Sequence, residues 1–177
     1  MKVCLVGEAA VGKSALIRRF VLDDFDDAYA QTLGTRIYKR AMTVSPHGEA
    51  VDVDLMIWDI MGQKGFRELL KDAYFYGAHG ILAVADLTRR ETFADLGGWI
   101  DGVREVAGNV PIVLLANKAG VWDRTIVKES DVAGAAERYG APHFLASAKT
   151  GDNVERAFGD LVGRIAAAQV PRREGSG

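Results

Sequence analysis

Residues 7–14 read Gly7-Glu8-Ala9-Ala10-Val11-Gly12-Lys13-Ser14, a match to the pattern G-x-x-x-x-G-K-S that binds phosphate groups. Glycines at both ends of the loop let the backbone curl, so that successive N–H groups point at one phosphate chain. The lysine ammonium of such a loop reaches the outer phosphates, and the serine hydroxyl is a ligand for Mg²⁺. The stretch therefore predicts a site for the phosphates of a nucleotide, together with Mg²⁺.

The flanks of this loop favour a phosphate site over a chance match in a glycine-bearing turn. The apolar run from Val3 to Val6 precedes it and is typical of a buried strand. After it, apolar residues recur on one helical face, at positions 16, 17, 20 and 21. A loop that opens a helix in this way suits phosphates, because the helix N-terminus adds partial positive charge beneath them.

The composition predicts a single soluble domain. The chain has 177 residues, of which 49% are hydrophobic, and this is enough for one buried core. Its net charge of −2 gives no case for nucleic-acid binding, which needs a clustered basic face. The lone cysteine, Cys4, excludes an internal disulfide and favours an intracellular, cytoplasmic location. We find no signal peptide and no apolar stretch long enough to span a bilayer.

Residues 1–168 are expected to form this domain, and residues 169–177 a short flexible tail. The tail contains no cysteine, so it cannot carry a prenyl group, and its two arginines are too few for a polybasic membrane anchor. We therefore expect any membrane contact to be made through partners. The last three residues, Gly175-Ser176-Gly177, are typical of a cloning remnant, in which case a native tail is missing.

Two kinds of strand are predicted. Residues 35–44 mix β-branched, aromatic and charged residues, and residues 51–58 alternate apolar and polar ones. The turn residues Ser45-Pro46-His47-Gly48 lie between them, so an antiparallel hairpin is expected. Later strands are near-continuous apolar runs, typical of buried parallel strands, at residues 81–85, 110–116 and 143–146.

Helices are expected between these strands. The sequence Thr88-Arg89-Arg90-Glu91 predicts a capping box that opens one helix, a shorter helix is expected over residues 130–139, and an amphipathic helix begins near Asp152. The alternation predicts an α/β fold: a doubly wound, mostly parallel six-stranded sheet with one antiparallel edge strand and about five helices. Because ligands of such sheets bind at the carboxyl ends of the strands, motifs that follow strands should converge on one site.

A second motif, Trp58-Asp59-Ile60-Met61-Gly62-Gln63, follows directly on a predicted strand. Asp59 can hold Mg²⁺ through a water molecule, opposite the serine of the phosphate loop. Gly62 would let a backbone N–H approach the terminal phosphate, and Gln63 would orient an attacking water. Alone, D-x-x-G is a weak pattern, but after a phosphate loop at this spacing it is a strong one.

Three further stretches complete the candidate site. Thr32 lies in a loop, where its hydroxyl would complete the Mg²⁺ shell only while the terminal phosphate is present, although a lone loop threonine usually has no such role. Two stretches that follow later strands are candidates for binding the base: Asn117-Lys118-Ala119-Gly120 and Ser147-Ala148-Lys149.

Together these motifs resemble those of the Ras superfamily of small GTPases and are most similar to its Rab branch. The resemblance covers roughly residues 2–168 and includes Tyr-Phe-Tyr-Gly-Ala-His-Gly at 74–80 and Asp86-Leu87-Thr88. It implies the P-loop NTPase fold and a Mg²⁺-dependent switch between GTP and GDP with slow hydrolysis. It also implies an exchange factor, a GTPase-activating protein, and effectors that bind around Thr32 and after Gln63.

The resemblance further implies individual roles. Lys13 would bind the phosphates and Gln63 would position the nucleophilic water, and with Thr32 they form the expected catalytic set. Ser14 and Thr32 would ligate Mg²⁺, with Asp59 behind a metal-bound water. Phe25 would lie against the guanine face, and the Ala148 N–H would donate to guanine O6. The other nucleotide contacts are expected from Ala9, Ala10, Val11, Gly12, Ala15, Tyr29, Gly62, Asn117, Lys118, Ser147 and Lys149.

Position 120 departs from the family's N-K-x-D pattern, because Gly120 stands where an aspartate is expected. That carboxylate normally accepts hydrogen bonds from the N1–H and 2-amino groups of guanine. Hydrogen bonds to a charged group contribute roughly 1.5–3 kcal/mol, so the loss would lower guanine affinity by about 10²-fold or more. Asp123 is a candidate substitute, but a solvated loop residue is the favoured interpretation. Guanine selectivity is therefore an open question.

Other positions depart as well. Ile60-Met61 stands where the family has Thr-Ala, and Met61 beside the terminal phosphate would crowd the switch or slow hydrolysis. Ala9 replaces a glycine or serine close to where a partner's arginine would insert. Lys64-Gly65 replaces a glutamate and a basic residue, so partner contacts there are expected to differ. Arg36 follows Thr32, the wrong side for an arginine finger, and is expected to begin the edge strand.

These departures keep a second class of function open. A pseudo-GTPase, used as a binding or scaffold module, would bind nucleotide weakly or without selectivity. A P-loop nucleotide kinase is a poor third interpretation, because we find no arginine-bearing lid segment and the motif from Trp58 to Gln63 suits hydrolysis better.

Overall fold

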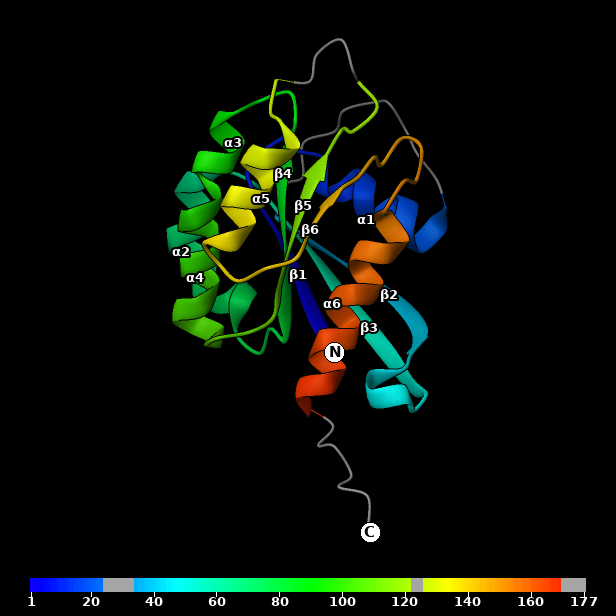
Figure 1. Ribbon diagram of the computed structural model, residues 1–177. Helices are drawn as coiled ribbons and strands as arrows, with labels where there is room; N and C mark the ends of the chain where they lie inside the picture. Colours follow the sequence, from blue (N-terminus) through cyan, green and yellow to red (C-terminus); the bar gives the residue numbers. More distant parts are fainter. Residues whose placement is uncertain (24–33, 122–125, 170–177) are drawn as a thin grey trace.

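The structure is a computed structural model that describes residues 1–23, 34–121 and 126–169. In chain order its elements are β1 (Lys2–Val6), α1 (Lys13–Leu22), β2 (Thr35–Val44), the 3-10 turn η1 (Pro46–Gly48), β3 (Val51–Ile60), α2 (Lys64–Phe75), β4 (Gly80–Asp86), α3 (Glu91–Ala94), α4 (Leu96–Ala107), β5 (Ile112–Asn117), α5 (Glu129–Glu137), β6 (His143–Leu145) and α6 (Val154–Gln169). Figure 1 shows a central sheet with helices on both sides.

The strand order is β2-β3-β1-β4-β5-β6. The strand β2 pairs antiparallel with β3, and the other neighbours pair in parallel. The prediction of a mostly parallel six-stranded sheet with one antiparallel edge strand is therefore confirmed. The hairpin prediction is also confirmed: β2 spans Thr35–Val44, and η1 joins it to β3. Arg36 lies near the start of this edge strand, as expected.

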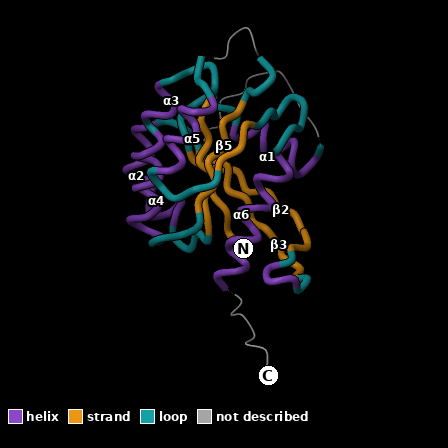
Figure 2. The backbone as a smooth tube through the Cα atoms, viewed as in Figure 1, coloured by secondary structure: helices purple, strands orange, loops and turns teal. Residues whose placement is uncertain are grey.

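The sheet separates two hydrophobic cores. Along β1, Val3 and Leu5 pack into one core, while Cys4 and Val6 pack into the other, because successive side chains of a strand point to opposite faces. The helices α1 and α6 cover the first face, and α2 to α5 cover the second (Figures 1 and 2). The fold is thus doubly wound, as predicted. None of the described helices is both long and apolar enough to cross a membrane.

The predicted capping box at Thr88–Glu91 is wrong. The backbone N–H and the hydroxyl of Thr88 both donate to Asp86 Oδ1, at 2.9 and 2.7 Å, so this threonine closes a turn directly after β4. The helix α3 begins at Glu91 without a side-chain cap, and Asp95 separates it from α4. Asp86 binds the Thr88 hydroxyl that a capping box would use at the start of the helix. The capping-box pattern takes no account of an acceptor two residues earlier in the chain.

The helix α2 has no counterpart among the expected elements. It follows Gln63, which makes no side-chain capping bond, and its second residue is Gly65. Glycine and a missing cap both disfavour helix initiation. The local signals for a helix start are therefore weak, although α2 spans Lys64–Phe75 and packs on the second core through Phe75.

Candidate functional site

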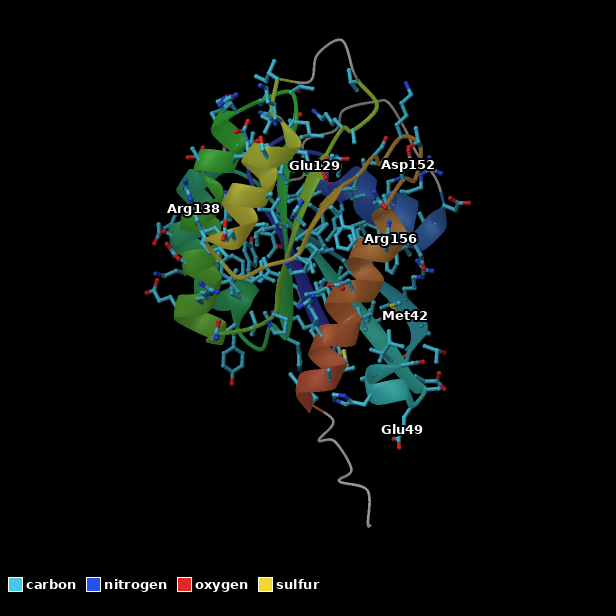
Figure 3. All side chains as sticks on the ribbon, in the orientation of Figure 1. Met42, Glu49, Glu129, Arg138, Asp152 and Arg156 are labelled. Atoms are coloured by element: carbon cyan, nitrogen blue, oxygen red, sulfur yellow. The ribbon has the colours of Figure 1, made fainter. Side chains whose placement is uncertain are left out.

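The loops that carry the motifs meet at one edge of the sheet. The strands β1, β3, β4, β5 and β6 are parallel, so the loops that follow them leave from the same edge. In Figure 3, Asp152 in the loop before α6 marks this end of the molecule, while Glu49 in the hairpin turn marks the opposite end. The expected convergence is borne out by contacts between these loops.

The backbone of the phosphate loop is tightly curled. Gly7 has φ 140° and Gly12 has φ 99°, both in the region that favours glycine. A Cβ on Gly7 would lie 2.2 Å from the Val84 carbonyl oxygen, and a Cβ on Gly12 would lie 2.2 Å from Asn117 Nδ2. Both positions therefore require glycine. Ala10 also adopts a left-handed conformation, with φ 63°, which continues the curl.

Lys13 lies over this loop. Its ammonium donates to the carbonyl oxygens of Gly7 and Glu8, each at 2.8 Å, and the residue is only 6% exposed. Burial lowers the pKa of Lys13 to about 8, although the nearby carboxylates of Asp59 and Glu8 oppose the shift. A phosphate beside this ammonium would favour its charged form, because an opposite charge raises the pKa of a lysine.

Ser14 and Asp59 form the metal-binding candidate. The Ser14 hydroxyl donates to Asp59 Oδ2 at 2.5 Å, and Asp59 is fully buried. The parallel pairing of Leu5 with Asp59 puts this carboxylate at the end of β3, next to the loop that follows β1. Mg²⁺ prefers hard oxygen ligands and keeps several waters, so a hydroxyl beside a carboxylate fits it.

The motif after β3 lies directly on the phosphate loop. A Cβ on Gly62 would be 2.4 Å from both Ala9 N and the carbonyl carbon of Glu8, so only glycine permits this approach. Met61 is buried, and its N–H donates to the Gly34 carbonyl at 3.3 Å. Gln63, half-buried, follows at the start of α2. This placement is compatible with the role expected of the Gly62 N–H.

Asn117 connects three loops. Its Nδ2 donates to the Val11 carbonyl at 2.9 Å, and its Oδ1 accepts from the Ala148 N–H at 3.1 Å. A backbone bond of 2.9 Å from Ala119 N to Ala146 O joins the same two base-site loops. The structure thus brings the first stretch expected to bind the base against the phosphate loop, and the second stretch against the first. The Ala148 N–H, expected to donate to a base, here donates to Asn117.

Lys118 forms an ion pair at the end of β4. Its Nζ lies 2.6 Å from Asp86 Oδ2, and Arg89 Nε donates to the same oxygen at 3.0 Å. Arg89 also donates to the Ala9 carbonyl at 2.9 Å, which links the ion pair to the phosphate loop. Burial alone would raise the pKa of Asp86, but hydrogen bonds from Lys118, Thr88 and Arg89 outweigh it and hold that pKa below its ordinary value. Asp86 is therefore a buried anion with committed partners.

Two arginines of this edge were not identified from the sequence. Arg89 joins the ion pair to the phosphate loop. Arg19 donates to the carbonyls of Ala148 and Lys149, at 2.9 and 2.8 Å, and holds that loop against α1. For Arg89, the stretch Asp86-Leu87-Thr88 directly before it was an available signal. Arg19 lies on the polar face of a helix, where an arginine has no distinctive pattern.

Gly120 is exposed, and its N–H donates to the Lys118 carbonyl at 3.1 Å. Its φ lies outside the left-handed region, and the nearest atom to an added Cβ would be Ser147 Oγ at 3.8 Å, an ordinary contact. Neither the backbone nor the available space demands glycine at this position.

Four of the residues singled out from the sequence lie outside the described residues: Phe25, Tyr29, Thr32 and Asp123. The roles expected of them stay predictions. The other expected site residues, from Ala9 to Ala15, from Asp59 to Gln63 and in the two base-site loops, all lie in or next to the loops of this edge.

The amino-acid sequence of the chain was compared with those of known proteins, and the similar ones belong to one family. The family model described as Ras family matches residues 2–167. The chain is 35% identical over 165 residues to the Ras-related protein RABA4b of Arabidopsis thaliana, which covers 93% of this chain and 71% of that protein. It is also 35% identical over 165 residues to the Ras-related protein RIC1 of Oryza sativa subsp. japonica, with 93% and 79% covered.

Proposed function

The chain belongs to the Ras family, and on this premise we propose that it is a Rab-like molecular switch that binds GTP and GDP with Mg²⁺ and hydrolyses GTP slowly. The resemblance predicted from the motifs is confirmed by the family match and by the two Ras-related relatives. Family membership by itself covers neither the Mg²⁺ dependence, nor the slow rate of GTP hydrolysis, nor the protein partners, and we propose these three.

One observation carries the proposal: the Ser14 hydroxyl lies 2.5 Å from the buried Asp59 carboxylate, next to the buried ammonium of Lys13. A cation, a hydroxyl and a carboxylate gathered on a glycine-curled loop supply what a phosphate chain with Mg²⁺ needs. The steric demand for glycine at Gly7, Gly12 and Gly62 supports the same interpretation, because each lets backbone approach closely where a side chain would intrude.

The roles that we propose follow from this placement. Lys13 would hold the outer phosphates, and Gln63, at the start of α2, would orient the attacking water. Ser14 and Thr32 would ligate Mg²⁺, and Asp59 would hold one of its waters. When bound, Mg²⁺ supplies positive charge that offsets the charge of the phosphates. Phe25, Tyr29 and the two base-site loops would contact the nucleoside.

Partner binding is the second half of the proposed function. Several large apolar side chains are exposed on β2, on β3 and at α2, namely Ile37 at 48%, Met56 at 40%, Leu69 at 78% and Tyr76 at 78%. Exposed apolar groups of this kind favour contacts with other proteins. We propose that effectors, an exchange factor and a GTPase-activating protein bind near this surface and near Thr32.

Nucleotide turnover tests the proposal. Purified protein loaded with GTP and Mg²⁺ should release phosphate slowly in a single turnover, and Gln63→Ala should lower the rate roughly tenfold to hundredfold, because the attacking water loses its orientation. Gln169→Ala, at the end of α6, is the matched control and should leave the rate unchanged. GTP binding with no turnover that depends on Gln63 would contradict the hydrolytic part.

A function as a pseudo-GTPase is the second candidate. It is favoured by Gly120, which replaces the expected aspartate, and by Met61, a large residue just before α2. It predicts that partners bind equally well whether GDP or a non-hydrolysable GTP analogue is present. Partner binding that changes with the nucleotide would exclude it.

A further inference from the structure

We propose that Arg89 is a positioning residue of the phosphate loop: it holds the Ala9 carbonyl and thereby keeps the strained Ala10 in the orientation that binds phosphate. The inference rests on the proposed function, because it requires the loop to hold the phosphates of a nucleotide. Arg89 belongs to neither the phosphate loop nor the motif after β3, since it lies between β4 and α3.

Ala10 has a strained backbone. Its φ is 63°, and the other residues of the loop with positive φ are Gly7 and Gly12. The left-handed conformation costs a residue with a Cβ the equivalent of about five- to thirtyfold in an equilibrium constant. In a curled loop the same conformation lets successive N–H groups converge on one anion. Strain of this kind persists only where surrounding contacts hold it.

Arg89 supplies such a contact. Its Nη2 donates to the Ala9 carbonyl oxygen at 2.9 Å. None of the described peptide bonds is cis, so the Ala10 N–H points in the direction opposite to that carbonyl. Rotation of this peptide would relieve the strain by changing φ of Ala10, but it would also break the bond to Arg89. The arginine therefore fixes the direction of the Ala10 N–H.

Arg89 is itself firmly anchored. Its Nε donates to Oδ2 of the fully buried Asp86 at 3.0 Å, and its backbone N–H donates to the Asp86 carbonyl at 3.0 Å. Its own carbonyl accepts from the hydroxyl of the buried Thr92 at 2.7 Å. The planar guanidinium presents several donors in a fixed geometry, which suits two partners at once. One side chain thus joins a buried carboxylate to the phosphate loop.

A purely structural role for Arg89 is the alternative, in which it acts only through Asp86 and Lys118. Lys118 Nζ shares Asp86 Oδ2 with it, at 2.6 Å. The two roles differ in their dependence on the Ala10 side chain. Glycine adopts the left-handed conformation without a steric cost, so Ala10→Gly removes the strain that Arg89 is proposed to hold. A role through Asp86 would be unaffected by that change.

The experiment is a titration of the full chain with GDP in Mg²⁺, by competition against a fluorescent GDP analogue. Arg89→Met should weaken GDP binding by about five- to thirtyfold, because the loop relaxes and binding must restore the strain. In the Ala10→Gly background, Arg89→Met should weaken it by about threefold or less. Arg90→Met is the matched control, since that side chain is 68% exposed, and its Kd should stay within about twofold of the wild type.

Urea unfolding shows that the compared variants are folded, which we expect because the Arg89 side chain is 34% exposed. Equal weakening by Arg89→Met in both backgrounds would overturn the inference and assign the effect to the ion pair with Asp86. Unchanged GDP affinity in Arg89→Met would overturn it as well. Both results leave the proposed function intact, because the wild type still binds GDP. If the wild type bound no GDP in Mg²⁺, the proposed function would fail and the inference with it.

Discussion

Asp86 shows how much a single residue can organise at this site. Its carboxylate holds Lys118 from one base-site loop and Arg89, which in turn holds the Ala9 carbonyl of the phosphate loop. Lys118 also has a left-handed backbone, with φ 70°, a conformation that costs energy for a residue with a side chain. The ion pair therefore stabilises the strained backbone of Lys118, which lies in a stretch that we propose contacts the nucleoside.

Replacing this charge tests its role. Asp86→Asn keeps the shape but removes the anion that two cations share, so we expect the free energy of unfolding to fall by about 1.5–3 kcal/mol and GDP affinity to fall by about tenfold. Urea unfolding and nucleotide titration measure the two effects. Asp101→Asn, an exposed carboxylate of α4, is the control and should change neither quantity. Unchanged nucleotide affinity in Asp86→Asn would refute the positioning role.

At the scale of elements, the first core depends on contacts between α1 and α6. The rings of Phe20 and Phe158 are stacked with centroids 3.9 Å apart and planes 3° from parallel. Arg40 of β2 lies 3.8 Å above the Phe20 ring and forms a two-pronged ion pair with Glu155 of α6. These contacts join α6 to α1 and β2, which lie far earlier in the chain.

Removing one ring should measure this junction. Phe158→Ala leaves a cavity against Phe20, and such changes cost about 3–5 kcal/mol. For a chain of this size each kcal/mol lowers Tm by about 2–4 °C, so we expect a loss of roughly 10 °C in thermal unfolding. Leu22→Ala, on α1 but 60% exposed, is the control and should shift Tm by little more than about 1 °C. An equal shift in both variants would show that the stacked pair does not hold the helices together.

At the scale of the whole molecule, stability should depend on the ligand. The loops after β1, β3, β5 and β6 meet at one edge, so a nucleotide with Mg²⁺ would bridge them in the folded state only. At a ligand concentration of about 100 times Kd, this adds about 2.7 kcal/mol to the free energy of unfolding. Chelation of Mg²⁺ and removal of nucleotide should therefore lower Tm by roughly 5–11 °C.

Lys13→Ala is the matched variant for this measurement. It removes the buried ammonium that we place on the phosphates, so its Tm should scarcely respond to the chelator or to added nucleotide. Equal responses in the variant and the wild type would mean that the shift arises from ions bound elsewhere.

Most of the fold follows from local patterns. The alternation of residues 51–58 and the apolar runs at 81–85 and 143–146 predict β3, β4 and β6 within about one or two residues, because burial on one or both faces of a sheet determines which residues a strand tolerates. The helix α2 and the true start of α3 were not predicted. Both begin without a side-chain cap, so nothing in the local sequence marks them.

Some features of the candidate site likewise follow from local sequence, and others depend on the tertiary structure. The sequence by itself determined the phosphate loop, the carboxylate after β3 and the two base-site stretches, because glycine placement and strand ends are local properties. Only the tertiary structure decided that Ser14 contacts Asp59, 45 residues away, and that Lys118 pairs with Asp86, 32 residues away. Those pairings depend on which strands become neighbours in the sheet, and strand order is a property of the packed molecule and not of any one stretch.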